Sequence, residues 1–426
     1  MTFRRSLPGS LWPWNHVSNR TYKSKPLSSA RCSRSSMSFL RWLSGASVLL
    51  SSLLATHGQH VSSRASTAIA PRVLILSMFD DEGGAWYDIP EFNVLAKNIT
   101  IPGLSPLFPQ LHCTTNHDIC QLTTGEGESN AAVSLTALTY SPLVNLTTTY
   151  ILIAGIAGIN PKIATVGSVT FARYAVQVGL QYEIDPREVP PGWSTGYFPQ
   201  DSTAPGQFPG VFYGTEIYEL NDALRQRAFN VAKTAKLNDS MDALPLRQQY
   251  AQNPDFVSGG GSPPKVALCD TATSDTYWDG TLLAEAFENT VKVFTNGSGL
   301  YCSTQQEDNA TLQALLRGAL TKRVDFSRII IMRTASDFDR QGPNQTAVDS
   351  LLGPEPGYEP SILNIKIAGI KVVDMILNGW KDEFECGITA KNYVGDVFDS
   401  LGGKLKPDFI PKPSSKKLRR QLRRNV

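Results

Sequence analysis

The fold class is decided by the run Ile329-Ile-Ile-Met332 and the segment Arg333-Thr-Ala-Ser-Asp-Phe-Asp339 that follows it. A short apolar run bounded by polar residues is typical of a strand that is covered on both faces. Ser336 and Asp337 come at the end of this strand. The sequence therefore predicts a carboxylate at the carboxyl edge of an α/β sheet, where open parallel sheets bind small ligands.

Other segments repeat the order strand, glycine-containing turn and helix, which is typical of a parallel or mixed sheet. We expect strands at 72–77, 119–124, 150–154 and 265–269, and helices at 131–138, 214–236 and 361–380. Segments rich in proline and glycine at 185–210 and 252–264 predict long loops. The fold class that we expect is α/β, a single domain with a mixed central β-sheet flanked by helices.

Charge is distributed unevenly along the 426 residues. Residues 1–41 contain eight Lys or Arg and no acid, and residues 404–424 contain nine Lys or Arg with one acid, Asp408. The remaining body holds 23 basic and 37 acidic residues. Because an acidic body repels the phosphate backbone, the composition argues against nucleic acid as a ligand.

The chain is expected to have three parts. Residues 1–65 form a basic leader and a secretory signal, with Met37 as an alternative start and an apolar segment at 43–55 that is too short to span a membrane. Residues 66–403 form the α/β domain, and residues 404–426 form a basic, disordered tail. Beyond this signal or anchor we expect no transmembrane segment. Secretion, or display at the cell surface, is favoured by six Asn-x-Ser/Thr sequons, at Asn98, Asn145, Asn238, Asn296, Asn309 and Asn344.

The cysteines and histidines are few. Removal of the leader leaves five cysteines, which in an oxidising compartment allow two disulfides, and Cys113 with Cys120 could close a local loop. No Cys/His spacing typical of a metal site is present, so we expect no metal. Only His112 and His117 remain in the predicted domain, which argues against a histidine-based catalytic triad.

Several separated segments occur in an order that resembles the purine nucleoside permease family of fungi. They are Arg72–Met78, Asp80–Gly84, Thr124–Gly127, Ala154–Gly158, Cys269–Trp278, Tyr301–Asn309 and Arg333–Asp337. The resemblance covers about residues 70–400. It implies the fold of the nucleoside phosphorylase and nucleosidase superfamily, no cofactor, purine nucleosides such as adenosine, guanosine and inosine as ligands, and a homo-oligomer as in many superfamily members.

The resemblance to methylthioadenosine nucleosidase implies roles for the acidic residues. Asp81 or Glu82 would activate water, with an acidic turn at a strand end as the alternative. Glu307 would bind the ribose hydroxyls and stabilise positive charge on the sugar, although the neighbouring Asn309 lies in a sequon. Asp337 would protonate purine N7, with a helix N-cap as the alternative.

The resemblance also implies residues that surround the ligand. Gly125 and Gly127 would form a turn at a helix N-terminus, and Gly155 and Gly158 a second turn that lets the ligand approach the backbone. The segment after the strand at 265–269 adds Asp270, Tyr277 and Trp278; the two aromatic rings would stack on the base, or would simply pack in the core.

Ile153 stands where phosphorylases of the bacterial type have a phosphate-binding arginine. Water is therefore the favoured acceptor. The expected function is nucleoside binding in support of uptake and metabolism, with hydrolysis of the N-glycosidic bond to base and ribose. Two alternatives stay open, namely a binding or storage protein without turnover and a purine nucleoside phosphorylase.

Overall fold

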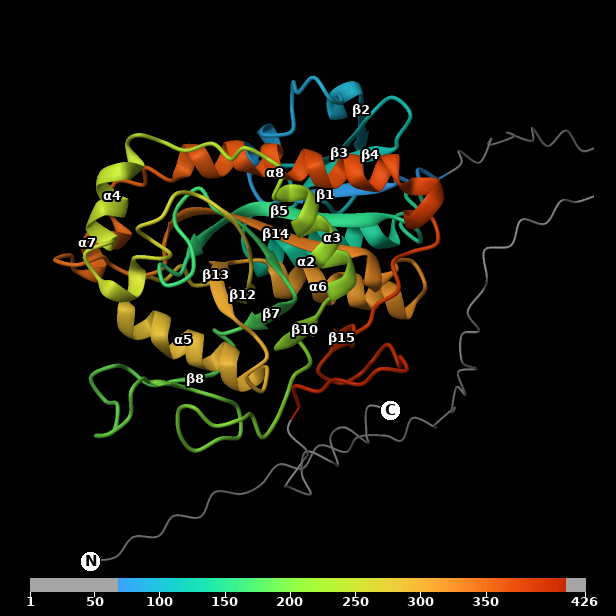
Figure 1. Cartoon of the computed structure of the whole chain (residues 1–426). Helices are drawn as coiled ribbons and strands as arrows, with labels where there is room; N and C mark the ends of the chain where they lie inside the picture. The colour runs from blue at the N-terminus through green and yellow to red at the C-terminus, as the bar shows by residue number, and fades with distance from the viewer. Residues whose placement is uncertain (1–67, 411–426) are drawn as a thin grey trace, which may run out of the picture. The chain divides into compact units, whose positions relative to one another are not determined.

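The computed structural model describes residues 68–410. A central β-sheet lies between helices in this part of the chain (Figure 1). Strand β5 (Tyr150–Ile159) is at its centre, with β1 (Val73–Ser77) on one side and β14 (Ile329–Phe338) on the other, both parallel to β5. The expected leader and signal, and residues 411–426 of the expected tail, lie outside the described residues.

Parallel and antiparallel pairs both occur, so the sheet is mixed. β1 pairs in parallel with β4, whereas β5 and β13 are antiparallel. The remaining strands of the sheet are β2 (Lys97–Thr100), β3 (Gln110–Cys113), β4 (Ile119–Thr123), β6 (Val169–Ala172), β7 (Tyr174–Gln177), β10 (Ile217–Glu219), β11 (Val266–Leu268), β12 (Asp270–Thr273), β13 (Tyr301–Gln305) and β15 (Gly395–Asp396). A separate hairpin consists of β8 (Tyr182–Glu183) and β9 (Tyr197–Phe198). The expected α/β class with a mixed central sheet is confirmed.

The described α-helices range from 5 to 21 residues in length. The α-helices are α1 (Asp80–Gly84), α2 (Glu128–Tyr140), α3 (Asp222–Ala232), α4 (Ala243–Tyr250), α5 (Thr281–Phe294), α6 (Asp308–Leu320), α7 (Ala347–Leu351) and α8 (Tyr358–Asn378). Short 3₁₀ turns lie at Val94–Ala96, Pro254–Phe256 and Phe326–Arg328, and a π-helical turn at Trp380–Phe384. No described helix is long and apolar enough to cross a membrane.

Alternation along β14 explains why both faces of the sheet are covered. Ile329 and Ile331 pack in the cluster that includes α2 and α6, whereas Ile330 and Met332 pack in the cluster that includes α8. In Figure 1, α8 lies on one side of β1, β5 and β14, and α2 and α6 lie on the other. Because successive side chains of a strand point to opposite faces, a continuous apolar run needs a helical layer on each side.

Two expectations about elements are wrong. Residues 154–158 were expected to turn, but β5 continues through them because they stay paired with β14. The single helix expected at 214–236 is instead β10 followed by α3. Asn221 separates the two elements, and its side-chain oxygen accepts from the Leu224 amide as an N-cap does.

Two disulfide bonds lie within the described residues. Cys113 and Cys120 join the neighbouring antiparallel strands β3 and β4, as the sequence allowed. Cys269 and Cys302 join the start of β12 to β13, a pairing that sequence analysis did not specify. The second bond ties together the two strands whose carboxyl ends lead into the site described below.

The packed chain extends beyond the boundary expected at residue 403. Phe409 is fully buried, with its ring 5.9 Å from that of Tyr174 and 6.1 Å from that of Tyr393. Residues 404–410 therefore belong with the domain rather than with a disordered tail.

Replacement Phe409→Ala should lower the free energy of unfolding by about 3–5 kcal/mol, because it opens a cavity in a buried aromatic cluster. Denaturant unfolding of the purified protein measures this. Leu405→Ala is the control, since Leu405 is 46% exposed and its truncation should change little. Equal, small effects of both variants would show that 404–410 do not stabilise the domain.

Candidate functional site

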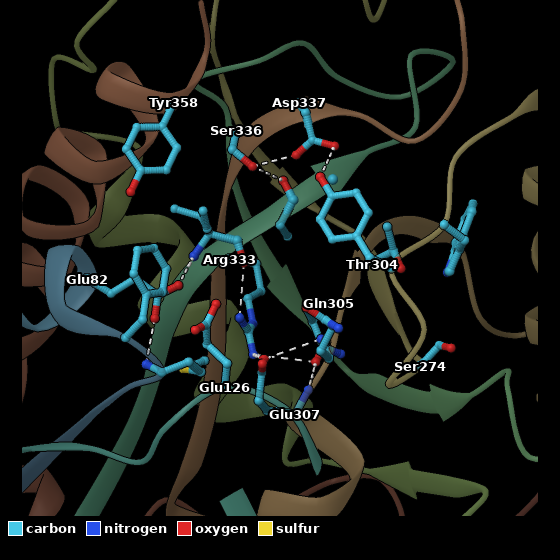
Figure 2. A pocket seen from close by; sticks show the side chains of 18 of the residues that line it. Glu82, Glu126, Ser274, Thr304, Gln305, Glu307, Arg333, Ser336, Asp337 and Tyr358 are labelled. Atoms are coloured by element: carbon cyan, nitrogen blue, oxygen red, sulfur yellow. Dashed lines mark hydrogen bonds and ion pairs between the residues drawn. The ribbon is translucent and has the colours of Figure 1, made fainter. Parts of the chain in front are cut away.

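A cavity of about 300 Å³ opens where β1, β5 and β14 lead into their connections. This volume is at the lower end of the range for ligand pockets. Its described lining contains five carboxyl groups, those of Glu82, Glu126, Glu307, Asp337 and Glu355. Arg333 is the single basic residue among these lining residues. In Figure 2, Asp337 and Ser336 lie at one end of the site, Glu307 and Gln305 at the other, and Arg333 between them.

An irregularity at the end of β14 aims Asp337 at the cavity. The pairing of β14 with β5 shifts between Ala335 and Asp337, so that Asp337 lies opposite Gly158 with Ser336 as the extra residue. Such bulges redirect a side chain and are frequent beside active sites. The local alternation of the strand alone does not predict this orientation.

The Asp337 carboxyl group accepts two hydroxyl donors. Ser336 Oγ donates to Oδ1 at 2.5 Å, and the Tyr277 hydroxyl donates to Oδ2 at 3.1 Å. Burial raises the pKa of Asp337 to about 7; the Ser336 hydrogen bond opposes this, and the nearby Glu355 adds to it. A carboxyl group with this pKa retains its proton in many molecules near neutral pH and can act as a general acid.

Glu82 reaches the cavity from helix α1 and is 1% exposed. Its Oε2 accepts from the Met78 amide at 2.6 Å, and its Oε1 accepts from the Ile156 amide at 2.7 Å. Burial raises the pKa of Glu82 to about 8, while the Arg333 guanidinium lowers it and Glu307 raises it. Of the two acids that the sequence left open as the base, Glu82 lines the cavity.

Asp81 points elsewhere. Its Oδ2 accepts from the Tyr358 hydroxyl at 2.6 Å, and Asp81 is not part of the lining, although Tyr358 is. The structure therefore separates the two acids: Glu82 faces the cavity, and Asp81 links the start of α8 to α1.

Arg333 is buried in a cluster of acids. Its Nη2 lies 2.6 Å from Asp308 Oδ1 and 3.4 Å from Glu307 Oε2, and its Nη1 donates to the Ile156 carbonyl at 3.0 Å. Burial raises the pKa of Glu307, whereas Arg333 and the hydrogen bond from the Gly127 amide lower it. The carboxylates on β13–α6 and α1 thus surround one guanidinium from β14.

The glycines act through the backbone. Gly125 and Gly127 have φ of 87° and 84°, a conformation that favours glycine, and they place the Gly127 amide 3.0 Å from Glu307 Oε1. A Cβ on Gly155 would lie 2.5 Å from Glu82 Oε1, so only glycine leaves room for that carboxylate. Gly158 lines the cavity directly.

The residues after β11 divide into three environments. Tyr277 lines the cavity and is 54% exposed. Trp278 reaches the lining but packs mainly in the core, with its ring 5.0 Å from that of Phe287. Asp270 is buried away from the cavity, where it accepts from the backbone amides of Arg173, Tyr174 and Leu300. Asp270, which was expected to contact the ligand, is therefore not among the residues that line this cavity, and three backbone donors hold its carboxylate.

Asn309 lies in a glycosylation sequon beside the site, and its side chain is buried. Asn309 is 1% exposed; its Nδ2 donates to the Thr215 carbonyl at 2.6 Å, and its Oδ1 accepts from the Thr273 hydroxyl at 2.7 Å. A glycan on Nδ2 is incompatible with these contacts.

Sequence analysis assigned no role to Arg333, Ser336, Gln305 or Tyr358. A charged residue directly after the apolar run 329–332 was the available signal for Arg333. No comparable signal marks Tyr358, which reaches the site from the first turn of a helix. Within residues 68–410, no group of three or more His, Cys, Asp or Glu side chains is arranged to hold a metal ion.

The fold and the site define an α/β protein with a mixed sheet and an acidic cavity at the strand ends. The family model for purine nucleoside permeases (NUP) matches residues 70–389. A purine nucleoside permease of Candida albicans is 44% identical over 360 residues, covering 83% of this chain and 86% of the relative. A probable purine nucleoside permease of Schizosaccharomyces pombe is 42% identical over 320 residues, covering 73% of this chain and 90% of the relative. The chain belongs to the purine nucleoside permease family.

Two solved structures are among those that match this chain. Futalosine hydrolase of Helicobacter pylori is 14% identical with a TM-score of 0.43, covering 71% of this chain and 97% of its own. The second is the 5′-methylthioadenosine/S-adenosylhomocysteine nucleosidase of Neisseria meningitidis in complex with methylthio-immucillin-A. It is 12% identical with a TM-score of 0.43, covering 73% of this chain and 99% of its own.

Replacement Asp308→Ala should lower the free energy of unfolding by about 3–5 kcal/mol, because it leaves the buried Arg333 without its shortest ion pair. Thermal or denaturant unfolding measures the loss. The control is Glu383→Ala, which breaks the exposed pair with Arg227 and should cost less than about 1 kcal/mol. A loss for Asp308→Ala no larger than for the control would contradict a structural role of this cluster.

Proposed function

We propose that the protein binds purine nucleosides in this cavity and hydrolyses their N-glycosidic bond to base and ribose. The observation that carries the proposal is the separation of roles within one cavity. A carboxyl group with a pKa near 7, Asp337, stands at one end, and Glu307 stands at the other. Arg333 lies between them, and Glu82 also lines the cavity. The chain's membership of the purine nucleoside permease family supports a purine nucleoside as the ligand.

In the proposed reaction Asp337 donates its proton to purine N7. The bond between C1′ and N9 breaks, and its electron pair goes to the base, which N7 protonation makes a better leaving group. Glu307 accepts hydrogen bonds from the ribose hydroxyls and stabilises the positive charge that develops on the sugar. Glu82 takes a proton from water as the water oxygen forms the new bond to C1′. Tyr277 stacks on the base or bounds it at the mouth of the cavity.

Water is favoured over phosphate as the acceptor. The Arg333 charge is already shared by Asp308 and Glu307, and the lining otherwise carries carboxyl groups. Ile153, in the place of the phosphorylase arginine, is 1% exposed and packs in the core. A phosphate dianion would meet net negative charge in this cavity.

One observation favours a binding protein without turnover as the second candidate. Both Glu82 oxygens accept backbone amides, and its pKa of about 8 leaves much of it protonated at neutral pH. A base in that state activates water slowly. In either case the protein would support nucleoside uptake from outside the cell, and the two disulfide bonds support folding in an oxidising compartment.

Hydrolysis should show a bell-shaped dependence of kcat/KM on pH, centred near pH 7.5. Activity requires Glu82 to be ionised and Asp337 to be protonated. The ionised fraction of Glu82 rises as the pH passes its pKa of about 8, and the protonated fraction of Asp337 falls as the pH passes its pKa of about 7. The pair is in this state in roughly one molecule in twenty at the optimum. Initial rates of base release from inosine between pH 5 and 10 measure the profile.

Replacement Asp337→Asn should lower kcat by about 10²–10⁴-fold and remove the alkaline limb of the profile, because the general acid is lost. Glu82→Gln should remove the acidic limb instead. Asp255→Asn is the matched control, since Asp255 is an exposed carboxyl group outside the cavity lining and should leave both limbs unchanged. An unchanged profile in Asp337→Asn would contradict the assignment of the acid.

A further inference from the structure

A second cavity of about 300 Å³ lies next to the first and shares part of its wall. Ser336, Asp337 and Glu355 line both cavities. Glu355 is exposed on the connection between α7 and α8. The proposed general acid therefore stands between two spaces, and the proposed chemistry uses only one of them.

The wall of the second cavity combines apolar side chains with polar ones such as Gln249 and Ser350. Tyr250 and Phe338 are 1% and 3% exposed and stack with their ring centroids 3.8 Å apart. Leu246, from α4, is half-buried beside them.

The chemistry of a purine connects the two spaces. N7 and the group on C6 lie on the same edge of the ring, as the major-groove pattern of adenine and guanine shows. If Asp337 binds N7, the C6 substituent is directed toward the residues next to Asp337, which are those that the second cavity shares.

We propose that the second cavity receives the substituent on C6 of the purine, so that the site accepts 6-substituted purine nucleosides with an uncharged, apolar group such as N6-benzyl. This inference rests on the proposed function, because it places the ring by the Asp337–N7 contact. Besides Asp337, the described lining contains the acids Asp242, Asp349 and Glu355 and no Lys or Arg. A substituent that carries a carboxylate is therefore disfavoured.

The test compares adenosine, N6-benzyladenosine and N6-(carboxymethyl)adenosine on the full-length protein. The readout is kcat/KM for release of the base, or the dissociation constant from calorimetry if the nucleosides stay intact. We expect the kcat/KM or affinity for N6-benzyladenosine to be within tenfold of that for adenosine. The value for the carboxymethyl compound should be at least tenfold lower than that for the benzyl compound.

Leu246→Trp, which fills the second cavity, should lower the kcat/KM or affinity for N6-benzyladenosine at least tenfold. The value for adenosine should stay within twofold of that of the unmodified protein. Val348→Trp is the matched control, because it adds the same ring on α7 at a position that is 63% exposed and outside the lining. It should leave both ligands unchanged.

The outcomes separate the two proposals. Adenosine binding with a loss of more than 100-fold for N6-benzyladenosine would overturn the inference and leave the proposed function standing. Equal effects of Leu246→Trp on both ligands would also overturn it. Absence of any adenosine binding or cleavage would overturn the proposed function and, with it, the inference.

Discussion

The site depends on one buried cation, the guanidinium of Arg333. It projects from β14 toward the carboxylates of Glu307 and Asp308 and to the carbonyl of Ile156 on β5. A charge buried in this way is stable only when it is paired and hydrogen-bonded. The cluster therefore fixes β14, β5 and the start of α6 relative to one another, and with them the two ends of the cavity.

The same cluster sets the balance of charge in the cavity. Arg333 lowers the pKa of Glu82 and Glu307, while burial raises both. At the other end Asp337 has only hydroxyl donors, and burial there raises its pKa to about 7. The pKa values of the carboxyl groups are therefore set by different surroundings at the two ends, as the roles of general acid and general base require.

The sequence predicted the parts of the fold that depend on apolar periodicity. The runs at 73–77 and 329–332 became central strands because both their faces are buried. It failed at 154–158, where glycines indicated a turn but pairing with β14 keeps the segment in a strand. Local composition does not contain such a tertiary contact.

For the site, the sequence motifs identified five residues that line one cavity in the structure: Glu82, Glu307, Asp337, Gly158 and Tyr277. It could not choose between Asp81 and Glu82, since that depends on the single turn of α1. It also placed Asp270 at the ligand, although backbone amides hold that carboxylate. The bulge at Ser336 and the approach of Tyr358 arise from long-range packing, which one-dimensional spacing does not encode.

The most direct test of the central claim is product analysis of inosine incubated with the purified full-length protein, with and without phosphate, by chromatography. The account predicts hypoxanthine and free ribose at the same rate in both conditions. Ribose 1-phosphate formed only when phosphate is present would contradict it in favour of phosphorolysis. Intact inosine, with binding measured by calorimetry, would contradict hydrolysis and leave a nucleoside-binding protein.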